Sequence, residues 1–226
     1  NILSSLLLQP YDNVVFLGDY FDDFNDTRED IKKTVIWLKQ SLHKHNRIHL
    51  MGTHDIWYRF PTNHYIMASG NTLKKSHIIN NILSESDWNI LKLYHFEQNH
   101  LMTHAGLHQY IIDSYKPIQK YSPNNIKELL ENVIEPATKE ALFHVSLNKS
   151  HLWVNAGFAR QGYQEVGGIT WLDWNQEFEP ISYINQIVGH TQIPIPKFNN
   201  IENSVNCCID TKNKHIGILE NGNFSY

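Results

Sequence analysis

The chain has 226 residues, of which 41% are hydrophobic, so it is long enough for one well-formed core and is expected to be a single domain over residues 1–226. A formal net charge of -4 and a pI near 6.4 argue against a broadly basic surface, so the sequence gives no strong signal for nucleic acid or for an anionic membrane. No apolar stretch approaches the roughly 18 residues that a membrane span requires.

The two cysteines, Cys207 and Cys208, are neighbours in the sequence. A disulfide between adjacent residues of a strand-like run would be strained, so we expect two free thiols. The N-terminus also lacks the basic flank and the cleavage site of a signal peptide. These features together predict a cytoplasmic location.

The first predicted elements are a strand, a helix and a second strand. Residues 13–18 are almost all apolar, which is typical of a buried parallel strand. Thr27, followed by Asp30 three residues later, predicts a capped helix start. One apolar stripe with helical spacing follows: Ile31, Val35, Leu38 and Leu42. Residues 47–51 predict a second strand, so residues 13–51 have the order of a βαβ unit.

The later elements begin with a hairpin. Residues 91–96 and 100–103 flank a turn signal and predict two paired strands that end next to His104. Ser122 and Pro123 predict the start of another helix, with a cap followed by proline at the first helical position. Strands are expected again at residues 186–189, 205–209 and 215–219, and the last two are predicted to form a hairpin through residues 210–214.

Polar motifs follow several predicted strands. Each is an apolar run that ends in glycine and then delivers a carboxylate or an imidazole, as in Gly18-Asp19, Gly52-Thr53-His54-Asp55 and Gly189-His190-Thr191. In open α/β sheets, the carboxyl ends of the strands form the edge where ligands bind. The motifs therefore predict a metal-dependent active site. The alternative is that Asp19 is a turn or capping residue and that the histidines are ordinary polar residues of the core.

In order and spacing, these motifs resemble those of the calcineurin-like metallophosphoesterases. The likeness is greatest to the bacterial and phage-type phosphoprotein phosphatases and diadenosine tetraphosphatases. Thr103-His104-Ala105-Gly106 completes the series, and residues 171–174 and 209–211 extend the resemblance over residues 13–220. The resemblance implies an α/β fold of the metallophosphoesterase type, a sandwich of two mixed sheets flanked by helices.

The resemblance also implies roles for individual residues. Asp19 would bridge two metal ions, and His104 and His190 would be ligands of the second one. His54 would act as general acid for the leaving oxygen, and Asp22 would hold its imidazole. The alternative for this pair is an ordinary surface loop.

Three departures from the family pattern qualify these roles. The family has an Asp-x-His element on a first strand, which supplies two ligands of the first metal, and none of the 18 residues before Asp19 forms it. Thr53 replaces the asparagine that binds the second metal, which makes it a weaker metal ligand. Asp23 replaces the phosphate-binding arginine after Asp22, and Arg59 or Arg160 could substitute for it, although either could be a surface arginine.

These observations lead to two hypotheses. The first is a metal-dependent phosphoesterase that hydrolyses a phosphomonoester or a nucleotide phosphoanhydride with water activated by a divalent metal, Mn first and Fe, Zn or Mg as alternatives. Its partner would be a small phosphorylated substrate, a nucleotide or a phosphoprotein. Trp57, Tyr58, Trp171 and Trp174 could stack on a nucleobase, or could serve only packing. The second hypothesis is a catalytically impaired or silent relative that acts as a binding or regulatory module.

Overall fold

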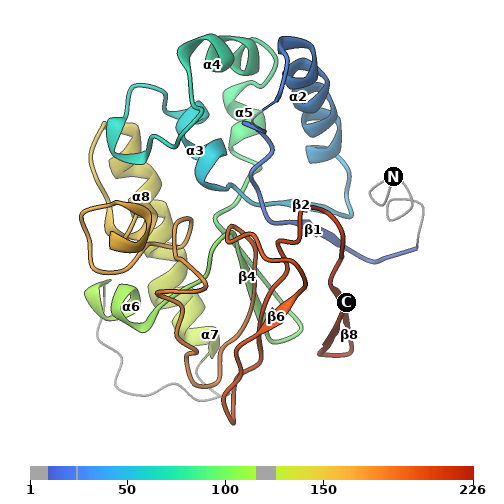
Figure 1. The fold of residues 1–226 in the computed structure, drawn as a ribbon, viewed down its shortest axis with the longest axis vertical. Coiled ribbons are helices and arrows are strands. Elements are labelled where there is room, and N and C mark those ends of the chain that lie inside the picture. Colours follow the sequence, from blue (N-terminus) through green and yellow to red (C-terminus); the bar gives the residue numbers. More distant parts are fainter. Residues whose placement is uncertain (1–9, 24, 116–125) are drawn as a thin grey trace.

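The computed structural model describes residues 10–23, 25–115 and 126–226, in which short strands alternate with helices (Figure 1). The strands are β1 (Val14–Phe16), β2 (Arg47–His49), β3 (Tyr94–Glu97), β4 (His100–Thr103), β5 (Asn185–Val188), β6 (Lys197–Phe198), β7 (Asn206–Cys208), β8 (Ile218–Glu220) and β9 (Asn223–Ser225). The α-helices are α2 (Arg28–Leu42), α3 (Thr53–Arg59), α4 (Leu73–Asn80), α5 (Glu85–Trp88), α6 (Gln109–Tyr115), α7 (Ile126–Leu129) and α8 (Glu135–Ser146). Short 3-10 helices are η1 (His64–Ile66), η3 (Leu152–Val154) and η4 (Phe158–Arg160), and η2 (Leu130–Ile134) is a π-helical turn between α7 and α8.

A parallel strand pair joined by a helix opens the fold, as the sequence predicts. β1 pairs in parallel with β2, and α2 connects them. Thr27 caps α2 through a capping box, in which its hydroxyl accepts the N–H of Asp30 and the Asp30 carboxylate accepts the N–H of Thr27. All four residues of the predicted apolar stripe are buried. The expectation that β1 is buried on both faces is wrong, since Val15 and Phe16 are only half-buried.

The largest sheet has the strand order β3-β4-β5-β7-β6 and is mixed. β4, β5 and β7 run parallel in its centre, while β3 and β6 pair with their neighbours in antiparallel fashion. β3 and β4 form the predicted hairpin, and its two-residue turn has positive φ at both Gln98 and Asn99. Parallel central strands place the loops after β4, β5 and β7 at one edge of the sheet.

The predicted hairpin between residues 205–209 and 215–219 is wrong. β7 is an inner strand, paired with β5 on one side and with β6 on the other, and its three residues are buried. The residues after it turn at Lys212 and Asn213, both with positive φ, and lead to a separate hairpin of β8 and β9. The turn itself was predicted correctly, but β7 pairs with β5 and β6 and not with the strand that follows the turn.

Figure 1 shows two groups of helices around the strands, α2 to α5 at one end and α6 to α8 beside β4. The predicted start of a helix at Ser122 and Pro123 lies outside the described residues. From residue 126 onward, α7 and η2 bury one apolar face: Ile126, Leu129, Val133 and Ile134, with Leu130 partly buried. The general α/β class is thereby confirmed, and the specific two-sheet sandwich stays a prediction. Among the described residues, no helix is both long and apolar enough to cross a membrane.

Two glycines bring the ends of β1 and β2 unusually close. Gly18 has a φ of +98°, and a Cβ atom placed on it would lie 2.4 Å from the backbone nitrogen of Gly52. A Cβ atom on Gly52 would lie 2.2 Å from Oδ1 of Asp19. No L side chain fits either space, so the glycines allow the motif after β1 to touch the motif after β2.

We predict that Gly18→Ala destabilises the protein by at least about 2 kcal/mol, because it combines an unfavourable φ with a backbone clash. Gly222→Ala is the matched control, since Gly222 also has a positive φ of +78° but an added Cβ would meet nothing closer than 3.9 Å. The control should lose only about 1 kcal/mol. Urea denaturation of both variants measures the difference, and equal losses would contradict the close-contact explanation.

Candidate metal centre

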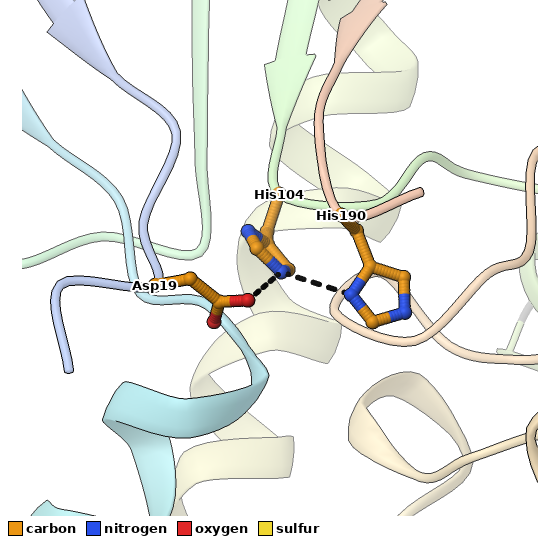
Figure 2. A group of neighbouring side chains, drawn as sticks. All are labelled: Asp19, His104 and His190. Carbon is orange, nitrogen blue, oxygen red and sulfur yellow. Dashed lines mark hydrogen bonds and ion pairs between the residues drawn. The ribbon is translucent and has the colours of Figure 1, made fainter. Parts of the chain in front are cut away.

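Asp19, His104 and His190 converge from three strand ends (Figure 2). Asp19 follows β1, His104 follows β4 and His190 follows β5. Nε2 of His104 lies 3.3 Å from Oδ2 of Asp19 and 3.2 Å from Nδ1 of His190. A metal ion with bonds of about 2.0–2.2 Å holds adjacent ligand atoms roughly 3.0–3.5 Å apart. The spacing of this cluster therefore suits one metal ion.

The ring protons of both histidines leave suitable nitrogens for a metal. Nδ1 of His104 lies 2.6 Å from the carbonyl oxygen of Leu17, which can only accept, so Nδ1 carries a proton and Nε2 is the available nitrogen. Nδ1 of His190 faces Nε2 of His104 (3.2 Å), and when this Nδ1 carries the lone pair, the ring proton of His190 lies on Nε2. That atom is buried and has no hydrogen-bond partner among the described residues. A buried nitrogen without a partner is costly unless a bound group or water completes the site.

The charges within the cluster are strongly coupled. Burial opposes ionisation of Asp19, but the adjacent His104 outweighs it and holds the pKa of the carboxyl below its usual range. Burial lowers the pKa of His104, yet the charge of Asp19 outweighs it and raises that pKa. Burial and then the charge of His104 place the pKa of His190 well below its usual value. Without a metal, a proton on His104 therefore lies between a carboxylate and a neutral imidazole.

The backbone is strained at the cluster. Asp19 has a φ of +59°, His190 of +63°, and the nearby Asp22 of +75°. Non-glycine residues adopt this region at a cost of about 1–3 kcal/mol each, and such residues are frequent at functional sites. The fold sustains this cost at residues whose sequence motifs predict a role in chemistry.

Asp55 holds the motif after β1 against the start of α3. Its fully buried carboxylate accepts three backbone N–H groups, from Asp19 (2.6 Å), Tyr20 (2.9 Å) and Gly52 (2.8 Å). Burial and the neighbouring Asp19 raise the pKa of Asp55 to about 7. Asp55 stands in the Gly52-Thr53-His54-Asp55 motif, but its role cannot be predicted from the sequence, because its hydrogen bonds depend on the contact between two loops.

His54 and Asp22 form the pair that the resemblance implies. Nδ1 of His54 lies 3.2 Å from Oδ2 of Asp22, and the backbone N–H of His54 donates to Asp19 (3.0 Å). Burial opposes protonation of His54, but the hydrogen bond to Asp22 outweighs it and raises the pKa of the imidazole. The ring is thus oriented through Nδ1, and its Nε2 has no hydrogen-bond partner among the residues that the structure describes.

Three further residues surround Asp22, and sequence reasoning missed them in this role. Asp22 accepts hydrogen bonds from the hydroxyl of Tyr58 (2.6 Å), Nδ2 of Asn71 (2.7 Å) and Nζ of Lys75 (2.6 Å). Burial would raise the pKa of Asp22, but its hydrogen bonds, first that with His54, lower it. Asn71 and Lys75 come from the segment around the start of α4, and no local sequence signal connects them with Asp22.

Two other candidates from the sequence, Thr53 and Arg160, lie beside residues of the cluster. The hydroxyl of Thr53 donates to both carboxylate oxygens of Asp19 (3.2 and 3.3 Å). Arg160 pairs with Asp173 (2.8 Å) and donates to the hydroxyl of Thr191, the residue after His190.

Arg59 is committed elsewhere. Its guanidinium pairs with Glu85 (2.6 Å), donates to the carbonyl of Trp88 (3.4 Å) and contacts the side chain of Asn89. All three partners lie in or directly after α5. These contacts give Arg59 a structural role at that helix, and none of them links it to the Asp19 cluster.

Of the four aromatic candidates, three are buried and one contacts the cluster. Trp57, Tyr58 and Trp174 are at most 4% exposed and pack in the interior, where the Tyr58 hydroxyl also donates to Asp22. Trp171 is half-buried, and its ring meets the ring of His190 edge-on with centroids 5.7 Å apart. Both cysteines are free and buried, as expected.

A second group of possible metal ligands consists of Glu140, His144 and His151. Nδ1 of His151 accepts the backbone N–H of Trp153 (3.4 Å), which places the ring proton of neutral His151 on Nε2, the nitrogen that faces Glu140 (4.0 Å). This arrangement presents a proton to the group rather than a lone pair, so it suits a metal less well than the Asp19 cluster does.

Comparisons with known proteins assign no function to the site. No family model matches the chain, and no curated protein matches it. Among solved structures, the chain is similar to a cold-active protein-tyrosine phosphatase of a psychrophile, Shewanella sp., with 14% sequence identity and a TM-score of 0.46. The likeness covers 87% of this chain and 59% of that one. A likeness of this extent supports no conclusion about activity.

We predict that Mn²⁺ binding weakens as the pH falls, because the metal must displace the proton of His104. The pKa of His104 is raised, so the imidazole is unprotonated only above that raised value, and affinity is lost as the pH falls through it. Calorimetric titrations between about pH 5.5 and pH 8, in buffers of different ionisation enthalpy, should show about one proton released per metal at the acidic end. A pH-independent affinity would contradict this assignment.

We also predict that Asp55→Ala lowers stability by at least about 3 kcal/mol, since three backbone N–H groups lose their acceptor and each unsatisfied buried donor costs about 1–3 kcal/mol. It should also weaken Mn²⁺ binding at least about tenfold, because the backbone of Asp19 is no longer held. Asp87→Ala is the matched control. Asp87 is a buried carboxylate in the capping box of α5, paired with Lys39 and His43 and not with the cluster.

The control should lose stability but retain its metal affinity. Urea denaturation and calorimetry measure the two properties separately. If Asp55→Ala bound Mn²⁺ as tightly as the unaltered chain, Asp55 would have no part in positioning the cluster.

Proposed function

We propose that the protein is a metal-dependent phosphoesterase that uses a metal-activated water to hydrolyse a phosphomonoester or a nucleotide phosphoanhydride. The observation that carries this proposal is the spacing of Asp19, His104 and His190 for one metal ion, next to the oriented His54–Asp22 pair. A ligand set of one carboxylate and two imidazoles suits Mn, Fe or Zn better than Ca. Three protein ligands leave positions open for water and substrate, as catalytic sites require.

A bound divalent metal supplies an acidified water as nucleophile and positive charge for the phosphoryl oxygens. The chain provides the rest. Thr53 and the N–H of His54 hold the carboxylate of Asp19 in place. His54, protonated on Nδ1 toward Asp22, donates the proton on Nε2 to the leaving oxygen.

Arg160 is the proposed phosphate-binding cation. Its side chain is 30% exposed, and it is fixed by Asp173 and Thr191 at the loop that carries His190. Arg59 is not included, because its contacts keep it at α5. Lys75 adds a positive charge beside Asp22, although there it is paired with a carboxylate.

The alternative, a silent relative that only binds a ligand, draws on the contacts of Thr53. Thr53 uses its hydroxyl to donate to Asp19, so it offers a metal less than an asparagine amide would. One assay separates the two hypotheses.

We expect Mn²⁺-dependent hydrolysis of p-nitrophenyl phosphate by the chain, and a higher rate after Thr53→Asn or in a version extended upstream to include any Asp-x-His element. Asp19→Asn should abolish hydrolysis, because it removes a charged ligand. His54→Gln should lower kcat by roughly 10²–10⁴, the usual contribution of a general acid.

His144→Gln serves as the control, because it alters the second His/Glu group without touching the Asp19 cluster, and it should leave the rate unchanged. If the chain, its Thr53→Asn variant and the extended version all bind Mn²⁺ but fail to hydrolyse the ester, the binding-module alternative is favoured.

A further inference from the structure

A cavity of about 320 Å³ lies beside the loop that carries His190. Two segments line it, one following β5 and one following β7: Gln192, Ile193 and Pro194, and Thr211, Lys212 and Lys214. None of these residues has a part in the site proposed above. The cavity is therefore a separate feature of the same sheet edge.

The topology places this cavity at the sheet edge where the loop with His190 begins. β5 and β7 are parallel neighbours, so the loops after them leave the sheet at the same edge. The loops are joined by a hydrogen bond from the N–H of Ile193 to the carbonyl of Asp210 (2.9 Å). Gln192 is only two residues beyond His190, which limits the distance between their Cα atoms to about 7 Å.

The cavity is cationic, although the chain as a whole is acidic. Lys212 and Lys214 are exposed, and neither ammonium group has an ion-pair partner among the described residues. The carboxylate of Asp210 faces its own loop, where Oδ1 accepts the N–H of Lys212 (3.3 Å). The hydroxyl of Thr211 is engaged with His215 (3.1 Å). The polar groups left for a ligand are two ammonium groups and the amide of Gln192.

The turn that presents the lysines is a defined one. Lys212 and Asn213 have φ values of +55° and +60°, and the N–H of Lys214 donates to the carbonyl of Thr211 (3.3 Å). Thr211 itself is buried. The buried end of the loop anchors the turn, so the two lysines flank a concave surface instead of extending from a free loop.

We propose that this cavity binds a second phosphate group of the substrate, next to the phosphate that is hydrolysed at the Asp19 cluster. This inference rests on the proposed function and narrows it, because the preferred substrate then carries two phosphate groups. Lysine ammonium groups bind phosphate as compact point charges with several donors. Two of them at a concave surface, with the Gln192 amide, form a subsite for an anion within reach of His190.

The binding test uses the full chain with Asp19→Asn, so that neither metal binding nor hydrolysis contributes. Inorganic pyrophosphate is the probe. We expect amide shifts in NMR spectra that centre on residues 192–194 and 211–214, and at least about tenfold weaker binding in K212A/K214A. K44A/K149A is the control, since it removes the same charge from two exposed lysines elsewhere in the chain. It should bind like the parent.

Shifts located elsewhere, or equal affinities of the two double variants, would overturn the proposal. The second arm uses the chain with its cluster intact. There, K212A/K214A should raise KM for a nucleoside diphosphate at least about tenfold while leaving p-nitrophenyl phosphate hydrolysis unchanged. The subsite would also be overturned if K212A/K214A left unchanged the ratio of kcat/KM for the nucleoside diphosphate to kcat/KM for p-nitrophenyl phosphate. Pyrophosphate binding at the cavity without any hydrolysis would instead refute the proposed function and leave the anion site standing.

Discussion

The site depends above all on the buried carboxylate of Asp55. Three backbone N–H groups from two separate loops converge on it, and they belong to Asp19, Tyr20 and Gly52. Each of these donors would be unsatisfied in the interior without it, and the cost would be about 1–3 kcal/mol for each. The same carboxylate thus determines where Asp19 lies and where α3 begins. The glycines at positions 18 and 52 are the steric counterpart of this constraint, because they alone permit the loops to approach.

A metal ion and a proton compete for the ligand atoms of the cluster. The carboxylate of Asp19 attracts a cation, and in the absence of metal the proton of His104 is that cation. His190 stays neutral because it is buried next to His104. The positive φ values at Asp19 and His190 add backbone strain. A site that holds strain and a displaceable proton is already arranged around the position of its ligand, and little reorganisation remains when the ligand arrives.

Much of this architecture could be predicted from the sequence, and the failures share one cause. Local signals gave the capped helix after Thr27, the β3–β4 hairpin and the strand ends that bring His104 and His190 to one edge. The environment of Asp22 could not be predicted, because Lys75 reaches it from 53 residues away. The hairpin expected between residues 205–209 and 215–219 was wrong because a turn signal specifies the bend and not the partner of the strand. The sequence pattern of a segment predicts its local structure, whereas the partner of a strand and the contacts of a side chain depend on tertiary packing.

The two buried thiols of β7 are chemical probes of how often the central sheet opens. Cys207 and Cys208 are at most 1% exposed, and burial raises the pKa of each thiol to about 12. Neither forms appreciable thiolate in the folded protein, so neither reacts until the strand separates from its neighbours. Because Sγ of Cys208 also contacts the carbonyl oxygens of Gly189 and Thr191, that separation releases the loop that carries His190. The rate of thiol labelling therefore reports how often the sheet opens beneath the metal centre.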